Sequence, residues 1–454
     1  MTFKSINPTD DTVLATFDEL SPSQLEEKLE RANSGFKQWR RSSFDERADV
    51  LRKTAEILIA GKDAWGRLMT LEMGKPLKQA VAEVEKSALT CGYFADNGAS
   101  FLVDQPITTE TDSKLRYLPL GTILAVMPWN FPFWQVFRCL APAVMAGNAV
   151  ALKHASNVPQ CALAIEEIMA RAGLPEGVFS TLLISSSKVA DVIRDPRIAA
   201  VTLTGSEGAG ASVGAAAGAA LKKCVLELGG NDPFIVLPSA DIDKAVATGV
   251  QARTVNNGQS CVCAKRFIVH RDVYDSFAEK FTASMQSLVV GDPMEDATQV
   301  GPLANEQGAS TIARQVEQSI AGGAHALTGG LPESRNGNYY APTVLENVEP
   351  GMPAYEEELF GPVAVLMRAD SFDHAIELAN DTPYGLGSSI WTCDPEEQQR
   401  CMNEIEAGLT FFNAMVASDP RLPFGGIKHS GYGRELGELG AREFTNVKTI
   451  VRAS

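Results

Sequence analysis

Two cysteines separated by one residue, Cys261 and Cys263, lie in the segment NNGQSCVCAKR at residues 256–266. A nucleophilic cysteine needs a polar turn with free backbone N–H groups, because only the thiolate attacks and an ordinary thiol is mostly protonated at neutral pH. The four residues NGQS before Cys261 supply such a turn. The same spacing also suits two cysteines that are buried on one face of a strand. The segment alone leaves a nucleophile and a buried pair equally open.

A second candidate is the carboxyl group of Glu227, in the apolar segment VLELGG at residues 225–230. A buried acid without a partner costs several kcal/mol, so this position indicates a cleft between domains. Partial burial raises the pKa of a carboxyl, which suits a general base that works near neutral pH. The alternative is a structural acid that caps the following turn.

A third candidate is the amide of Asn130, which stands between aromatic residues and two prolines in MPWNFPFWQVFR. An amide fixed in such a rigid loop can donate a hydrogen bond to a developing oxyanion. Loss of one such donor typically lowers the rate by about 10²–10³-fold. Together the three groups would suit covalent chemistry at a carbonyl carbon.

Six segments of the chain resemble the NAD(P)-dependent aldehyde dehydrogenase superfamily in order and spacing, over essentially the whole length. They are PWNFP (128–132), VTLTGS (201–206), LELGG (226–230), NGQSC (257–261), EELFGPV (357–363) and PFGGIKHSGYGRELG (423–437). One such segment is weak evidence, whereas six in sequence are specific.

The resemblance implies a role for each of the three candidates. Cys261 would attack the aldehyde carbon, and Asn130 together with the Cys261 backbone N–H would stabilise the oxyanion of the thiohemiacetal. Hydride would pass to the nicotinamide, and Glu227 would activate the water that hydrolyses the thioester to an acid. The presence of Glu227 argues against the branch of the family that acylates coenzyme A.

The expected cofactor is NADP, with NAD also possible. The chain has no GxGxxG motif, but GSEGAG at residues 205–210 opens a helix whose N-terminus can bind a phosphate. The resemblance places Lys153 and Ser156 at the adenosine ribose, where many NAD-preferring relatives carry a glutamate. The carboxylate of that glutamate would repel a 2′-phosphate by about 4 kcal/mol at ~4 Å. With Ser156 at this position, the repulsion is absent. The resemblance also places around the cofactor Trp129, Gly205, Ser206, Leu228, Glu358 and Phe360.

The expected substrate is succinate semialdehyde, with glutarate semialdehyde or broader aliphatic and aromatic aldehydes as alternatives. Succinate-semialdehyde dehydrogenases have an arginine at the position of Arg138, where it can bind a carboxylate through two hydrogen bonds. Trp134 is expected beside it. A second arginine of mammalian-type members is replaced by Val255, and their serine after the GRE motif is replaced by Gly437. The alternative for Arg138 is a salt bridge.

In some members of that group, two cysteines spaced like Cys261 and Cys263 act as a redox switch. Cys263 is therefore predicted to be a possible redox partner of the nucleophile. A metal site is not expected, because the five histidines are scattered and the other cysteines show no close spacing.

Apolar periodicity and turn signals predict an α/β protein with parallel sheets. Capping boxes are predicted at Ser21 and Ser43, in a helical region that reaches residue 102. Strands are predicted in AVALK, IAAVTLTGS, KKCVLELGG, PFIVL, FIVH, PVAVLMR, SSIWT and LTFFN. The C-terminal NVKTIVRAS is predicted to be a last strand without a pairing partner in the chain, whose edge a second subunit would cover.

The resemblance implies an aldehyde-dehydrogenase-like fold with a Rossmann-type cofactor domain, a second α/β domain and a small β arm for oligomerisation. The cofactor domain would span residues 1–106 and 121–229. The catalytic domain would span residues 230–433, and the arm residues 107–120 and 434–454. A homodimer or a homotetramer is expected.

The 454 residues carry a net charge of −16, which makes nucleic acid or an anionic membrane an improbable partner. An anionic substrate or cofactor therefore needs a locally basic site. The N-terminal segment MTFKSINPTDD has no apolar core of signal-peptide length, and no apolar run of the chain reaches membrane-spanning length. A cytoplasmic protein with reduced thiols is therefore expected.

Two functions of other classes stay open. A thioester hydrolase or acyltransferase would use the thiol without redox chemistry. A binding protein that has lost its activity could keep the fold, although it would have no need for Cys261, Glu227 and Asn130 together.

Overall fold

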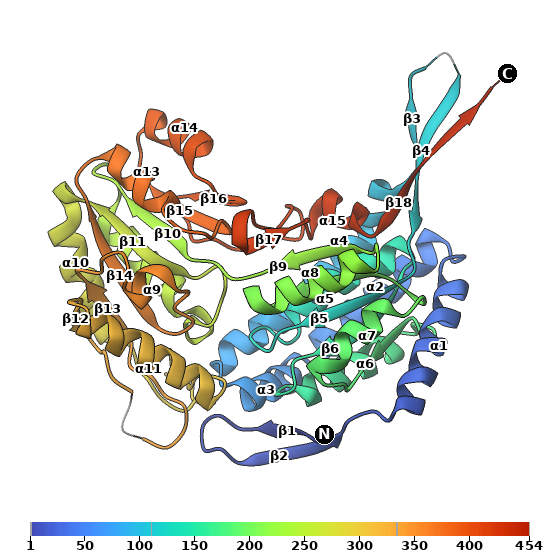
Figure 1. The fold of residues 1–454 in the computed structure, drawn as a ribbon, viewed down its shortest axis with the longest axis horizontal. Helices are drawn as coiled ribbons and strands as arrows, with labels where there is room; N and C mark the ends of the chain where they lie inside the picture. The colour runs from blue at the N-terminus through green and yellow to red at the C-terminus, as the bar shows by residue number, and fades with distance from the viewer. Residues whose placement is uncertain (1, 110, 333–334, 454) are drawn as a thin grey trace.

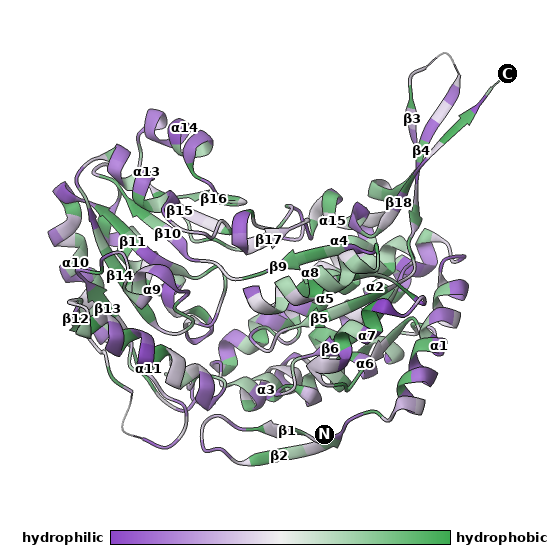
Figure 2. Cartoon of the chain, in the orientation of Figure 1, coloured by the Kyte–Doolittle hydropathy of each residue, from purple (hydrophilic) through white to green (hydrophobic). Residues whose placement is uncertain are grey.

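The computed structural model describes residues 2–109, 111–332 and 335–453. Two large sheets lie in separate halves of the molecule, and a three-stranded arm projects from one of them (Figure 1). Hydrophobic residues follow the strands of both sheets, whereas the outer helices carry many polar residues (Figure 2). The α/β class predicted from the sequence is confirmed.

The first large sheet has the strand order β17-β9-β8-β5-β6-β7, and all of its pairs are parallel except β17 with β9. Helices cover both of its faces, as the continuous apolar strands require. The strands are β5 (Thr122–Met127), β6 (Ala149–His154), β7 (Phe179–Thr181), β8 (Ile198–Thr204), β9 (Lys223–Glu227) and β17 (Gly431–Tyr432). The helices are α5 (Trp134–Ala146) and α6 (Pro159–Arg171) on one face, and α7 (Val189–Arg194) and α8 (Glu207–Ala219) on the other.

The second large sheet has the order β12-β13-β14-β11-β10-β15-β16, with only β12 antiparallel to its neighbour. Its strands are β10 (Asp232–Val236), β11 (Ala264–His270), β12 (His325–Thr328), β13 (Thr343–Glu346), β14 (Val363–Ala369), β15 (Gly387–Trp391) and β16 (Leu409–Phe412). The helices around it are α9 (Ile242–Thr254), α10 (Arg271–Gln286), α11 (Glu306–Ala321), α12 (Pro353–Glu356), α13 (Phe372–Asn380) and α14 (Pro395–Glu404).

The N-terminal region contains four helices, as its periodicity predicts, after a hairpin that the sequence analysis missed. The hairpin strands are β1 (Thr2–Ile6) and β2 (Val13–Asp18), and the helices are α1 (Pro22–Trp39), α2 (Phe44–Ala60), α3 (Lys62–Met73) and α4 (Leu77–Leu102). Both predicted capping boxes are present, at Ser21 with Gln24 and at Ser43 with Glu46. No helix in the described part of the chain is long and apolar enough to cross a membrane.

The prediction that the C-terminal strand has no partner in the chain is wrong. Strand β18 (Thr445–Arg452), after helix α15 (Gly437–Glu443), pairs along its whole length with β4 (Asp112–Pro119), which also pairs with β3 (Gln105–Ile107). Antiparallel partners can be far apart in sequence, so the partner of a terminal strand cannot be identified from local pattern. The residue limits of the three domains stay predictions.

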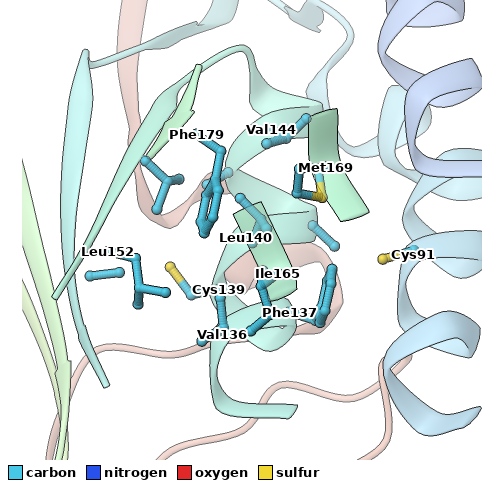
Figure 3. Packing of buried hydrophobic residues seen from close by; sticks show 14 of the residues in the cluster. Cys91, Val136, Phe137, Cys139, Leu140, Val144, Leu152, Ile165, Met169 and Phe179 are labelled. Atoms are coloured by element: carbon cyan, nitrogen blue, oxygen red, sulfur yellow. The ribbon is translucent and has the colours of Figure 1, made fainter. Parts of the chain in front are cut away.

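Helix α5 is fixed by a dense apolar core (Figure 3). Phe137, Cys139 and Leu140 of α5 are at most 2% exposed and pack among side chains of β6, α6 and α4. The same core therefore gives rigid support to Arg138, which lies between these residues on α5. It also supports the loop that carries Asn130, because α5 begins directly after that loop.

Candidate active site

The loop before Cys261 has an unusual backbone. Asn256, Asn257 and Gly258 have φ angles of 57°, 58° and 75°, so three consecutive residues are left-handed. A Cβ on Gly258 would lie 2.3 Å from the carbonyl oxygen of Gly361, so only glycine fits there. The Asn257 side chain donates to the carbonyl oxygens of Gly74 and Pro302, both at 2.9 Å. A left-handed backbone is strained at the two asparagines. It persists only where surrounding contacts hold it, as the hydrogen bonds of Asn257 do here.

The Asn256 side chain joins this loop to the loop of Asn130. Its amide donates to the carbonyl oxygens of Asn130 at 2.7 Å and of Gln259 at 2.9 Å. The Asn130 amide donates to the same Gln259 oxygen at 3.1 Å. Its second N–H has no acceptor among the described residues, so one donor of a fixed amide stays available for an oxyanion.

A buried lysine, Lys265, holds the nucleophile segment from the other side. Its ammonium donates to the carbonyl oxygens of Ser260 at 3.0 Å, Cys261 at 2.8 Å and Cys263 at 3.3 Å. It also lies 3.2 Å from Glu358. The sequence analysis missed this residue, although a lysine inside the apolar segment CAKRFIV was a signal, since buried charges need partners.

Cys261 lies in the wall shared by two cavities of about 310 and 280 Å³. Burial raises the pKa of its thiol to about 12, and the positive charges of Arg138 and Lys265 oppose this shift. The thiol is therefore protonated in this environment, and its attack on an electrophile requires removal of a proton.

The 280 Å³ cavity contains six of the residues predicted to bind the cofactor. These six are Trp129, Gly205, Ser206, Leu228, Glu358 and Phe360. The other lining residues of the cavity are Pro128, Asn130, Thr204, Gly229 and Cys261. Ser206 caps helix α8 and so places the helix N-terminus at this cavity. An apolar cavity with a helix N-terminus at its edge fits the nicotinamide half and the phosphates of a dinucleotide.

Lys153 and Ser156 stand apart from that cavity, at the end of β6 and just beyond it. Ser156 is exposed. No carboxylate of the described residues forms an ion pair with Lys153, and partial burial lowers the pKa of its ammonium. An unpaired lysine beside an exposed hydroxyl favours an anionic group such as a phosphate.

The 310 Å³ cavity contains the two residues predicted for the substrate, Trp134 and Arg138. Arg138 is 1% exposed and forms an ion pair with Glu435. It also donates to Thr204 Oγ1 at 3.0 Å and lies 4.6 Å from the ring centre of Phe424. The salt bridge considered as its alternative role is thus present, while the side chain still lines the cavity.

Of the two positions where the carboxylate-binding residues of mammalian-type members are replaced, Val255 lines the 310 Å³ cavity and Gly437 does not. Ser418 also lines this cavity. The sequence analysis also missed three residues of this cavity: Lys75, in the loop between α3 and α4, and Glu83 and Lys86 of α4. Their distance in sequence from the motifs hides this proximity.

Glu227 is 2% exposed and lies behind the cavity wall that its neighbour Leu228 forms. Burial raises the pKa of its carboxyl well above the usual range, and Arg138 acts in the opposite direction. Neither carboxyl oxygen has a hydrogen-bond partner among the described residues. Glu227 can act on a group bound to Cys261 only through a turn of its side chain or through a water molecule.

Cys263 is fully buried, and its thiol donates to the carbonyl oxygen of Val255 at 3.6 Å. Burial raises the pKa of this thiol. Cys263 lines neither of the two cavities. A disulfide between Cys263 and Cys261 stays a prediction. No cluster of metal-binding side chains occurs in the described parts of the chain.

Comparison with known proteins agrees with this geometry. The model of the aldehyde dehydrogenase family matches residues 1–450. A probable NADP(+) succinate-semialdehyde dehydrogenase of Synechocystis sp. is 53% identical over 451 residues, which cover 99% of both chains. An NADP(+) succinate-semialdehyde dehydrogenase of Mycobacterium ulcerans is 53% identical over 455 residues, also 99% of both.

A solved structure of succinic semialdehyde dehydrogenase from Streptococcus pyogenes in complex with NADP+ has a TM-score of 0.97. It is 40% identical and covers 99% of both chains. The sequence motifs, the two cavities that meet at Cys261 and these matches over the full length lead to one conclusion. The chain belongs to the aldehyde dehydrogenase family.

Proposed function

We propose that the protein oxidises succinate semialdehyde to succinate with NADP as the cofactor. The observation that carries this proposal is the position of Cys261, between a cavity suited to a dinucleotide and a cavity lined by Arg138. The likeness to the NADP(+) succinate-semialdehyde dehydrogenases supports the same substrate and cofactor.

In this mechanism the thiol of Cys261 loses its proton and its sulfur attacks the aldehyde carbon. The oxygen of the resulting thiohemiacetal becomes negative and accepts hydrogen bonds from the Asn130 amide and the Cys261 backbone N–H. NADP, held by the residues of the 280 Å³ cavity, would supply the acceptor for the hydride of this carbon. Glu227 then takes a proton from the water that attacks the thioester, which releases succinate and restores the thiol.

NADP fits the residues at the far end of the dinucleotide site. Lys153 forms no ion pair with an acid among the described residues, and Ser156 carries no charge that would repel a 2′-phosphate. The α8 N-terminus and Ser206 would bind the pyrophosphate, while Glu358 and Phe360 would hold the nicotinamide ribose and ring. NAD would remain a weaker cofactor.

The substrate proposal is tested with the purified enzyme, NADP and a panel of aldehydes with and without a carboxylate. Succinate semialdehyde should give one NADPH, measured at 340 nm, for each succinate formed. In Arg138→Ala, kcat/KM for carboxylated aldehydes should fall by about 10-fold or more relative to neutral aldehydes, because an ionic hydrogen bond is lost. Equal loss for all aldehydes would show that Arg138 only supports the fold through Glu435. Succinyl thioester cleavage without NADPH formation would instead indicate a hydrolase.

The cofactor proposal is tested by Ser156→Glu. A carboxylate beside the 2′-phosphate repels it, and solvent at this exposed position screens the repulsion. We expect the ratio of kcat/KM with NADP to kcat/KM with NAD to fall by at least about 10-fold. Ser156→Gln adds a similar shape without charge and should change the ratio much less. An unchanged ratio in Ser156→Glu would place the 2′-phosphate elsewhere.

We propose that copies of the chain assemble through the arm into a homodimer or homotetramer that works in the cytoplasm. The outer edge of β18 pairs with no strand of the described residues, and Val447 and Val451 of this strand are 51% and 58% exposed. Light scattering of the purified protein measures the assembly, and a monomer would contradict it.

A further inference from the structure

The cations that line the 310 Å³ cavity differ in one respect. Lys75 is paired with Glu83, and Arg138 is paired with Glu435. Lys86, on helix α4, lines the same cavity, and no carboxylate of the described residues forms an ion pair with it. Among the described residues, Lys86 is therefore the cation of this cavity that has no ion-pair partner.

The contacts of Lys86 leave part of its binding capacity free. Its ammonium donates one hydrogen bond to Ser418 Oγ at 2.7 Å and lies 4.3 Å from the ring centre of Trp134. An ammonium has three donors, so donors remain for another group. An enclosed lysine without a counter-ion is costly for the protein alone, and a bound anion would remove that cost.

We propose that Lys86 binds the carboxylate of the aldehyde substrate and makes the enzyme selective for aldehydes with an anionic end. This inference rests on the proposed function, because it assumes that the cavity holds the aldehyde attacked by Cys261. Val255, which replaces the second arginine of mammalian-type members, lines the same cavity. Lys86 supplies from α4 the second cation that this position lacks.

The charges around Lys86 also predict how this selectivity depends on pH. Burial lowers the pKa of Lys86 to about 8; Arg138 adds to this effect, whereas Glu83 and Asp419 oppose it. The ammonium is charged below this pKa and neutral above it. The preference for a carboxylated aldehyde should therefore fall as the pH rises through about 8.

The test compares succinate semialdehyde with butanal, which has the same number of carbons and no carboxylate. In Lys86→Met, which keeps the length without the charge, we expect KM for succinate semialdehyde to rise at least 10-fold. The kcat for this substrate should change less, because Lys86 does not touch the reacting carbon. Butanal oxidation reports whether the site is still folded, and its kcat/KM should change by less than about 3-fold.

Two further variants sharpen the comparison. Lys78→Met removes an exposed lysine of the same helix outside the cavity and should change neither substrate. Lys86→Arg keeps a charge at all working pH values, so the ratio of kcat/KM for the two aldehydes should lose its decline near pH 8. This ratio cancels the titration of Cys261 and Glu227, which both aldehydes need.

The possible results are distinct. Equal loss with both aldehydes in Lys86→Met would mean a structural role, and unchanged KM for succinate semialdehyde would mean that Lys86 does not contact it. Either result overturns the inference but leaves the proposed function intact. A wild-type enzyme that does not reduce NADP with succinate semialdehyde, or that does not prefer it to butanal, would overturn both.

Discussion

Cys261→Ala should reduce NADPH formation from succinate semialdehyde to background, a loss of about 10⁴-fold or more. Without the sulfur there is no thiohemiacetal, and hydride cannot leave an aldehyde carbon that carries no added nucleophile. The variant should still bind NADP, because most of the dinucleotide cavity belongs to other residues. The measurements are absorbance at 340 nm for turnover and fluorescence titration for cofactor binding.

Cys263→Ala is the matched control, since this buried thiol lies two residues away and outside both cavities. It should keep turnover within a few-fold of the wild type. The same variant examines the predicted disulfide: thiol-reversible inactivation by peroxide should disappear in it, although direct oxidation of Cys261 can mask this result. Normal turnover in Cys261→Ala would end the covalent mechanism.

The candidate reacting groups could be proposed from the sequence because they lie in short segments of unusual composition. The two asparagines and the glycine before Cys261 are residue types that tolerate the left-handed conformation found there. Asn130 stands in a loop stiffened by prolines. Such local requirements leave a signature in a few consecutive residues, although the resemblance to the family rests on six such segments together.

The electrostatic environment could not be predicted in the same way. Glu435 and Lys86 are ordinary charged residues in the sequence, and only the fold shows which charges neutralise each other. A locally basic site in this acidic chain stays a prediction, for which Lys153 and Lys86 are candidates because neither forms an ion pair with a described residue. Neither the partner of Arg138 nor that of strand β18 could be found from spacing, because each lies hundreds of residues away.

These pairings matter for Glu227, whose carboxyl is affected by three charged groups from distant segments, Arg138, Glu435 and Arg434. Arg138 favours its charged form, whereas Glu435 and, above all, burial favour the neutral form. A carboxyl with a raised pKa accepts a proton from water more readily than an ordinary one. Hydrolysis of the thioester should therefore accelerate as the pH rises through the pKa of Glu227, because only the deprotonated form is a base.

Glu227→Gln should separate the two halves of the reaction. The amide has nearly the same shape but cannot take a proton, so oxidation proceeds once and the acyl group stays on Cys261. We expect a burst of one NADPH per active site, followed by steady turnover that is about 10²–10³-fold slower than in the wild type. The acceleration with pH assigned to Glu227 should be absent from this slow phase.

Stopped-flow absorbance at 340 nm measures the burst, and mass spectrometry of the quenched enzyme should find one succinyl group on the peptide that contains Cys261. Glu317→Gln, which changes an exposed glutamate of α11 outside both cavities, is the control and should show neither effect. A slow variant without a burst would place Glu227 before hydride transfer, as the group that deprotonates the thiol. Unimpaired turnover would remove Glu227 from the mechanism, and the water would then need another base, for which Glu435, whose charge acts on Glu227, is the next candidate.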